Sequence, residues 1–293
     1  MRRRQDRARG GARQAGLAYA LLLPSFIGFS VFAYWPLYRL VHFATHQQSS
    51  RIGGAEKSVG FGPVKDVLTG DQFWSGTWIT VKYLLFTVPL GIVFGVLLAM
   101  VANRRLKGIK IFQTIFSSTV ASSVAVSSVV FLTLVNEQIG LLRNVSWLSL
   151  RHPDSALFAA ALSSVWQNLG LTFVIVLAAL QTVPEEVIEA ATLDGFGTVR
   201  RFFRVLMPLI SPALMFLAVV LVINAFQAYA QIELITGGGP LRSTETLLFK
   251  ITQLQKSSDL QIGASMALGL FGLTFLVALA QFGLLERRVH YGD

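Results

Sequence analysis

The sequence contains no cysteine and only four histidines among its 293 residues. Without cysteine, neither a disulfide nor a cysteine-ligated metal site can form. The histidines are scattered, and the zinc-binding pattern H-E-x-x-H is absent. No grouping of histidine with carboxylates, or of a serine with a base, points to catalysis. We therefore expect neither catalytic residues nor a metal site in this chain.

Charged residues are also scarce. They make up 14% of the chain, whereas a soluble domain usually has about 25%. Hydrophobic residues make up 53%, and the mean hydropathy is +0.60. This composition predicts an all-α membrane protein. The net charge is 25 − 15 = +10, but the basic residues lie in short segments beside apolar runs, as the positive-inside bias predicts. We therefore expect a lipid bilayer around the chain and no nucleic acid.

Two further absences restrict the kind of transporter. The chain has no Gly-Lys pair, so it cannot bind ATP through a G-x-x-x-x-G-K-[ST] loop. No long apolar run has a carboxylate in its middle, whereas proton-coupled secondary transporters often have buried acidic residues. Of the three functions considered, a membrane enzyme and a self-contained secondary transporter are thus disfavoured. The third is a transport subunit that a separate ATPase powers.

Six apolar runs are long enough to cross a membrane, which takes about 20 residues. The first should be kinked at Pro24. Polar residues, Trp166-Gln167-Asn168, and Gly170 interrupt the apolar sequence of the fourth. Residues 1–16 form a basic N-terminal segment, and residues 17–293 form a single transmembrane domain. The predicted spans cover residues 17–40, 77–102, 111–136, 156–181, 208–230 and 262–285.

The distribution of basic residues predicts the orientation. The N-terminal segment, residues 103–110, residues 182–207 and the C-terminal tail are rich in lysine and arginine. Residues 137–155 and 231–260 are not. Both termini should therefore be cytoplasmic. Lys82, near the start of the second span, should extend to the membrane interface.

The polar loop 182–207 joins the fourth and fifth spans. Thr182 and Glu185 have the spacing of a capping box, so a short helix should begin near Pro184. Gly195 or Gly197 should end it, since glycine adopts the left-handed conformation at little cost. Thr198 could cap a second helix. Val187, Ala190, Ala191 and Asp194 fall on one face at helical spacing, which the two alanines should make flat.

The same loop carries the most specific pattern in the sequence. Glu189-Ala190-Ala191 is followed at fixed spacing by Gly195 and by 205–208, Val-Leu-Met-Pro. This resembles the EAA loop of permease subunits of ABC importers, E-A-A-x3-G-x9-I-x-L-P, with Val205 for the usual isoleucine and Met207 for the usual leucine. The resemblance implies the type I, maltose-permease-like fold and alternating access. It also implies that an ATPase docks on Glu189, Ala190, Ala191, Asp194, Gly195 and Pro208.

The resemblance further implies the partners and the location. The expected partners are a second homologous permease subunit, two cytoplasmic ATPase subunits that bind ATP and Mg²⁺, and an extracytoplasmic solute-binding protein. The chain itself should hold no cofactor. The expected location is the bacterial plasma (inner) membrane.

Two segments are similar to the carbohydrate-uptake branch of this family: the TGGGP turn at 236–240 and Gly-Ala-Ser-Met-Ala at 263–267. Within that branch, residues 112–114, 200–203 and 286–291 are similar to the first permease subunit of importers for glycerol-3-phosphate or glycerophosphodiesters. A neutral di- or oligosaccharide such as trehalose or maltose is the alternative.

Polar residues in the fourth and fifth spans predict a solute path. Amides offer donors and acceptors to hydroxyl-rich ligands, and aromatic rings could stack on a sugar or face a choline-like cation. Equally, the amides could only join neighbouring helices. Neither span contains lysine or arginine, so a phosphate group would have to be neutralised elsewhere. The predicted path residues are Trp166, Gln167, Asn168, Asn224, Gln227 and Tyr229.

Overall fold

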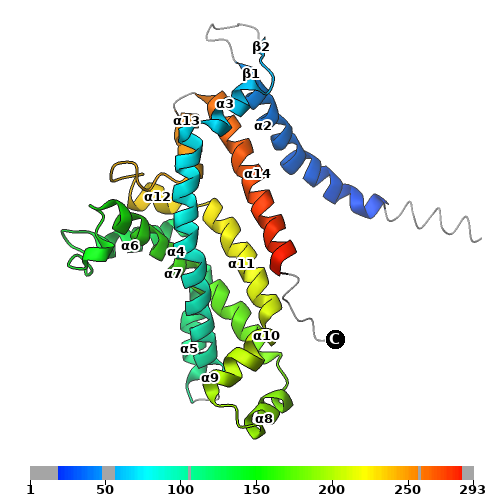
Figure 1. The fold of residues 1–293 in the computed structure, drawn as a ribbon, viewed down its shortest axis with the longest axis vertical. Helices are drawn as coiled ribbons and strands as arrows, with labels where there is room; N and C mark the ends of the chain where they lie inside the picture. The colour runs from blue at the N-terminus through cyan, green and yellow to red at the C-terminus, as the bar shows by residue number, and fades with distance from the viewer. Residues whose placement is uncertain (1–18, 48–56, 105–106, 257–258, 286–293) are drawn as a thin grey trace, which may run out of the picture.

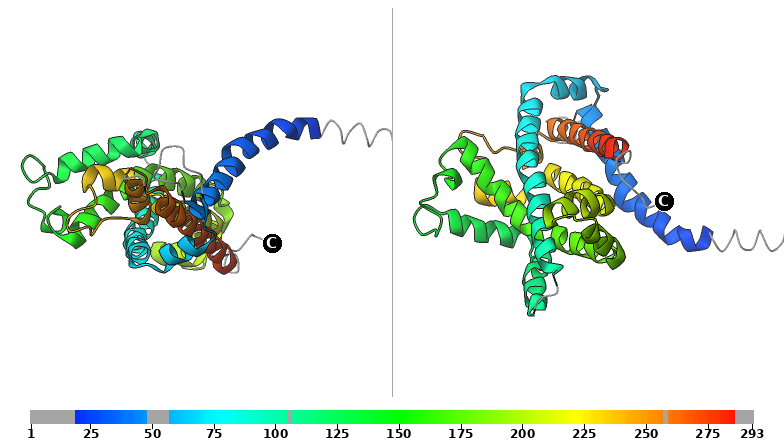
Figure 2. Two further views of the ribbon diagram at one scale, coloured as in Figure 1. Left: turned by 90° about the horizontal axis from the view of Figure 1, so that it is seen from above. Right: turned by 60° about the horizontal axis from the view of Figure 1, so that its bottom comes forward.

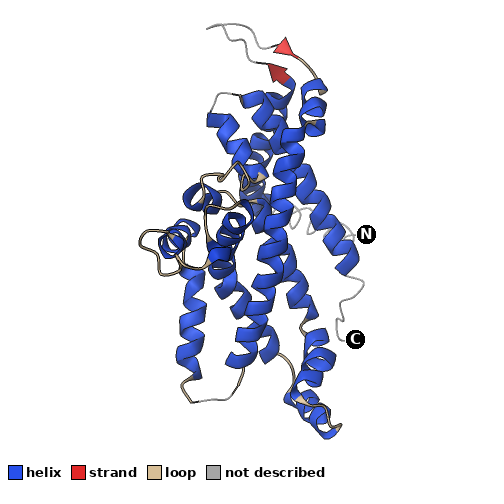
Figure 3. Ribbon diagram, turned by 60° about the vertical axis from the view of Figure 1, so that its left-hand side comes forward, coloured by secondary structure: helices blue, strands red, loops and turns tan. Residues whose placement is uncertain are grey.

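Long helices make up most of the molecule (Figures 1 and 3). The computed structural model describes residues 19–47, 57–104, 107–256 and 259–285. Side chains of residues 284 and 285 are not included. The predicted N-terminal segment 1–16 and the C-terminal tail 286–293 lie outside the described residues. The one sheet in the described part pairs β1 (His46–Gln47) with β2 (Lys57–Ser58) in antiparallel register.

Four helices are long and apolar enough to cross a membrane on their own. They are Tyr19–Thr45, which includes α2 (Trp35–Thr45), then α4 (Asp71–Ala102), α7 (Pro153–Gln181) and α14 (Leu260–Leu285). Two bent helix pairs, with bends of 107° and 72°, are apolar enough to be further candidate spans. Counting each pair as one span gives the predicted six. α4 starts six residues before its predicted span, because helix α3 (Gly62–Thr69) leads almost directly into it.

The first helix projects away from the others, as Figures 1 and 2 show. None of the residues in its most apolar window is buried. It passes through Pro24 without interruption, and its irregular part is a π-helical turn at Ser30–Tyr34. Its α2 end packs on α14 and α3. The helix is thus held to the bundle at one end and leaves its apolar surface for other contacts.

The third predicted span, 111–136, is not one continuous helix in the structure. α5 (Ile109–Ser117) runs into a 3-10 turn at Ser118–Ala121, and α6 (Val124–Val135) leaves at 107°. Ser123 caps α6, since its Oγ accepts a hydrogen bond from Val126 N at 3.2 Å. Serine side chains compete for backbone hydrogen bonds and so offer the chain an alternative to a continuous helix.

Gly170 of α7 allows this break to pack closely. A Cβ atom at this position would lie 2.3 Å from Thr119 Oγ1 and 2.6 Å from Val120 N. α7 itself is a continuous helix through the polar residues at 166–170. The amide of Asn168 does not break the helix because its Nδ2 donates to Ser164 O of the preceding turn at 2.9 Å.

The fifth predicted span, 208–230, contains a bend. The loop contains α8 (Glu185–Leu193) and α9 (Thr198–Arg201); a π-helical turn at Phe202–Leu206 and α10 (Met207–Leu209) follow. The chain then bends by 72° and continues as α11 (Ser211–Phe226). Pro212 lies in the first turn of α11, where its missing N–H costs no helical hydrogen bond. The predicted span 208–230 thus includes the bend and, at its far end, the first residue of α12 (Ala230–Ile235).

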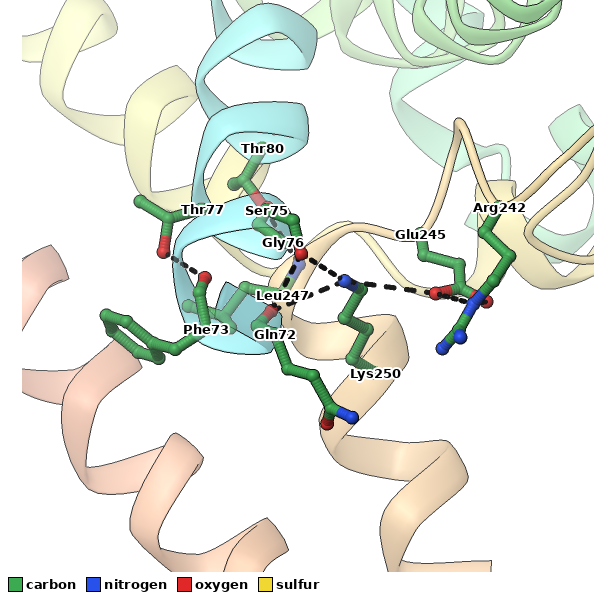
Figure 4. A network of polar contacts seen from close by, with 10 residues as sticks. All are labelled: Gln72, Phe73, Ser75, Gly76, Thr77, Thr80, Arg242, Glu245, Leu247 and Lys250. Atoms are coloured by element: carbon green, nitrogen blue, oxygen red, sulfur yellow. Dashed lines mark hydrogen bonds and ion pairs between the residues drawn. The ribbon is translucent and has the colours of Figure 1, made fainter. Parts of the chain in front are cut away.

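At the end of the bundle opposite α8, polar contacts fasten α13 (Leu247–Lys256) to α4 (Figure 4). Thr80 Oγ1 accepts a hydrogen bond from Leu247 N at 2.9 Å. Lys250 Nζ donates to Ser75 Oγ at 2.8 Å and lies 3.9 Å from Glu245 Oε2. Burial lowers the pKa of Lys250, and the charge of Glu245 opposes this shift. These contacts hold α13 against α4, and α13 contacts α12 through hydrogen bonds to Glu233.

Gly170→Ala should destabilise the protein, because the added methyl group has no room against the α5–α6 break. Overpacking of this kind costs about 1–3 kcal/mol. Gly272→Ala in α14 is the matched control, since a Cβ there has nothing within 4 Å. The midpoint temperature of thermal unfolding in detergent should fall for Gly170→Ala and stay at the wild-type value for Gly272→Ala. Equal midpoints would show that the break does not depend on Gly170.

Candidate functional site

Two regions hold the residues singled out by the sequence, and they lie at different heights of the bundle. The first is the loop with α8, at the lower end in Figure 1. Gly195 ends α8 with φ +77°. Phe196 N donates to Ala191 O, and Gly195 N donates to Thr192 O, each at 3.0 Å. This pair of bonds is the Schellman motif, and the predicted end of the helix is confirmed.

The predicted start of α8 is correct to one residue, but the capping box does not form. Pro184 is the N-cap residue and accepts no hydrogen bond through its side chain. Thr182 Oγ1 instead donates to Ala179 O of α7 at 2.8 Å. Similarly, Gly197 and not Thr198 is the N-cap of α9. Thr182 thus lies two residues before the N-cap of α8, and Thr198 lies one residue after the N-cap of α9.

Short-range contacts join α8 to the segment that follows it. Arg201 Nη1 donates to Thr192 Oγ1 at 2.7 Å. The guanidinium of Arg200 lies 4.6 Å from the ring centre of Phe196, a cation–π distance. Phe202 is buried in a core cluster with Leu180 of α7 and residues of α4 and α11. Through these contacts, a displacement of α8 would shift the side chains that pack against α4, α7 and α11.

The two alanines of the EAA pattern face different surroundings. Ala191 is only 6% exposed, whereas Glu189, Ala190, Asp194 and Gly195 are exposed. The flat face predicted from both alanines is therefore wrong, because α8 rests on the rest of the chain through Ala191. Pro208 is half-buried in α10, two residues before the bend.

Three exposed apolar side chains extend the free surface of this loop, and sequence reasoning missed them. Leu193 is 88% exposed, Val199 71% and Phe203 59%. Leu193 falls on the same face of α8 as Ala190. The sequence did carry a signal for this surface, since these three residues are apolar in an otherwise charged loop. An exposed apolar surface of this kind marks a contact with another protein or with the membrane.

The second region is a cavity of about 360 Å³ between α4, α7, α11 and α12. Its wall includes Gln167, Asn168, Asn224, Gln227 and Tyr229, five of the six predicted path residues. The sixth, Trp166, points elsewhere and packs against Phe131, with ring centres 6.0 Å apart, in a core cluster. The predicted polar residues of the two spans therefore converge on one space. The rest of the wall, which the sequence did not predict, consists of Tyr83, Thr87, Val124, Ser164, Leu221, Ala225, Ala230 and Gln231.

Hydrogen bonds join three walls of the cavity. Asn224 Nδ2 donates to Asn168 Oδ1 at 3.2 Å and so links α11 to α7. The hydroxyl groups of Tyr83 and Ser164 lie 2.5 Å apart and link α4 to α7. The alternative that some amides join helices thus holds for the two asparagines. Gln167 and Gln227 have no such side-chain partner within the described residues, so their amides are available to a ligand.

The wall contains no lysine, arginine, aspartate or glutamate among the described residues. Its polar groups are amides and hydroxyls, which can both donate and accept hydrogen bonds. Lys82, one residue before Tyr83 in the chain, points away, and its Nζ lies 5.9 Å from the ring centre of Trp78 in the preceding turn. The cavity can therefore hold a hydroxyl-rich solute without burying an unpaired protein charge.

Comparison with known proteins extends over almost the whole chain. The family model described as binding-protein-dependent transport system inner membrane component matches residues 91–291. The chain is 30% identical over 292 residues to the sn-glycerol-3-phosphate transport system permease protein UgpA of Yersinia pestis bv. Antiqua, covering 97% of this chain and 99% of that protein. It is also 30% identical to UgpA of Agrobacterium fabrum, covering 94% and 97%.

Two solved structures are similar in fold. One is a bacterial ABC transporter involved in the import of the acidic polysaccharide alginate, with TM-score 0.79 and 21% identity, covering 96% of this chain and 99% of that chain. The other is the inward-facing MetNI methionine ABC transporter, with TM-score 0.53 and 15% identity, covering 78% and 99%. The predicted type I importer permease fold is confirmed.

Proposed function

The chain belongs to the family of binding-protein-dependent transport system inner membrane components, and on this premise we propose that it imports glycerol-3-phosphate, glycerophosphodiesters or a related sugar. It is a permease subunit of an ABC importer, a translocation component and not an enzyme. The observation that carries the substrate class is the cavity, whose free amides at Gln167 and Gln227 match the hydroxyl groups of a polyol backbone. The named relatives, which are sn-glycerol-3-phosphate permease proteins, support the phosphate-bearing solute.

A neutral di- or oligosaccharide such as trehalose or maltose is the second candidate. It is favoured by one specific observation, the absence of charged side chains from the described cavity wall. Tyr229 offers a ring on which a pyranose could stack. Uptake of both kinds of solute by the complete transporter distinguishes the candidates.

The proposed partners are a second homologous permease subunit, two ATPase subunits that bind ATP and Mg²⁺, and an extracytoplasmic solute-binding protein. A periplasmic binding protein is present in a solved complex of the alginate transporter, which has this fold. The ATPase docks on the exposed side of α8, with Glu189, Ala190, Asp194 and Leu193 in contact. Ala191 and Gly195 hold the shape of α8 from behind and at its end.

The proposed mechanism is alternating access driven through one continuous segment of chain. Movement of α8 passes through Arg201 and the buried ring of Phe202 to α10, and across the bend at Ile210 to α11. Asn224, at the far end of α11, lines the cavity. Because packed helices move as rigid bodies, a small displacement at α8 can open or close the cavity. Pro208 adjoins the bend and so influences this coupling.

Ala190→Trp should prevent docking, because a bulky side chain on the exposed face of α8 blocks close approach of the ATPase. Membrane insertion should persist, while co-purification of the ATPase and solute-stimulated ATP hydrolysis should fall at least tenfold. Ala190→Ser, which stays small, is the matched control. Normal co-purification of the tryptophan variant would remove this face from the interface.

Gln167→Ala should lower the maximal uptake rate several-fold for the true substrate, because it removes an amide that is free to bind solute. Gln138→Ala, on an exposed loop, is the control. Radiolabelled glycerol-3-phosphate, glycerophosphodiester, trehalose and maltose should be tested in cells with the complete transporter. Unchanged uptake of every transported solute by the Gln167 variant would show that this wall does not contact the substrate.

The proposed orientation puts α8 and both termini in the cytoplasm of a bacterium. Ser146, between α6 and α7, and Thr198, at the start of α9, are both exposed, and the absence of native cysteine gives a clean background. Ser146→Cys should react with an impermeant thiol reagent in intact cells. Thr198→Cys should react only after permeabilisation. The opposite labelling pattern would invert the topology.

A further inference from the structure

A cation contacts one residue of the cavity wall, although none lines the described wall itself. Lys256, the last residue of α13, lies beside α12 and Tyr229. Its Nζ donates to the hydroxyl oxygen of Tyr229 at 3.2 Å and to Glu233 Oε1 at 3.1 Å. It also lies 5.8 Å from the ring centre of Tyr229. Since Tyr229 forms part of the cavity wall, the ammonium group is one side chain away from a solute held there.

The ion pair of Lys256 is open to exchange. The lysine side chain is 55% exposed and the Glu233 side chain 33%, and exposed pairs of this kind add little stability. An ammonium group has three donors, of which the contacts to Tyr229 and Glu233 use two. The hydrogen bond with Glu233 raises the pKa of Lys256, so the amine remains charged at neutral pH.

Glu233 would keep a partner if Lys256 turned towards a solute. Its second carboxylate oxygen, Oε2, accepts a hydrogen bond from Gln253 Nε2 at 3.2 Å. Gln253 and Lys256 are three residues apart on α13 and therefore share a face. Release of Lys256 thus leaves the carboxylate hydrogen-bonded and partly in solvent, so the exchange buries no unpaired charge.

We propose that Lys256 recognises the phosphate group of the solute at the rim of the cavity, where the phosphate takes the place of Glu233. This rests on the proposed import of phosphate-bearing solutes. A phosphate monoester carries a charge of about −1.5 to −2 at neutral pH, so it competes well with a single carboxylate. Lysine offers a mobile point charge, which suits binding strong enough for entry and weak enough for release.

A purely structural role makes a different prediction. If the ion pair only fastened α12 to α13, removal of either charge would weaken the same contact and slow transport alike. If Lys256 binds phosphate, removal of Glu233 eliminates a competitor and leaves the cation free. Glu233→Gln and Lys256→Gln should then have different effects.

The test is uptake of radiolabelled sn-glycerol-3-phosphate by the complete transporter in vesicles, with binding protein and solute at saturation. Lys256→Gln should lower the rate about five- to tenfold, as expected for loss of one partly solvated charge-assisted hydrogen bond. Lys256→Arg should retain most of the rate, and Glu233→Gln should match or exceed the wild type. Lys65→Gln, an equal charge change on exposed α3 at the same end of the bundle, should have no effect.

Equal slowing by Lys256→Gln and Glu233→Gln would overturn the proposal in favour of a structural ion pair. Wild-type uptake by Lys256→Gln would also overturn it, while leaving the proposed substrate intact. A wild-type transporter that carries trehalose or maltose but no phosphate ester would refute the proposed substrate, and this inference with it, before any variant is compared.

Discussion

Inside a bilayer, every backbone N–H and C=O group needs a partner within the protein, and this constraint decides where the chain can break. The α5–α6 break is capped by Ser123 and rests on Gly170 of α7. The α10–α11 bend is followed by a proline, which brings no N–H to satisfy. Ile210 at the second bend is buried, whereas Val120 and Ser123 of the α5–α6 break are exposed. Val124, directly after this break, lines the cavity.

A single stretch of polypeptide connects the loop with α8 to the cavity. One segment, 198–226, starts beside α8, bends once and ends at the cavity wall. Its start is fastened by Arg201 and its buried part by Phe202. The far wall is fastened by the Asn224–Asn168 hydrogen bond. A permease needs such a connection, because the energy source and the solute act at separate places.

The sequence predicted the parts that depend on local chemistry. Helix α8, its end at Gly195 and the amides of the cavity follow from glycine conformation, spacing and polarity within apolar runs. It did not predict the α5–α6 break, since an apolar run rich in serine has the same composition whether it is straight or bent. Nor could it predict that Tyr83 lines the cavity or that Lys256 contacts Tyr229, because tertiary packing places these distant segments together.

The opposite surroundings of the neighbouring residues Ala190 and Ala191 have a genetic consequence. At Ala191, the size limit is set by the same polypeptide, which buries this side chain. At Ala190, on the proposed docking face, the limit is set by a separate gene product. A bulky residue at 190 can therefore be rescued by an enlarged groove in the ATPase. One at 191 can be rescued only by second-site changes within the permease itself.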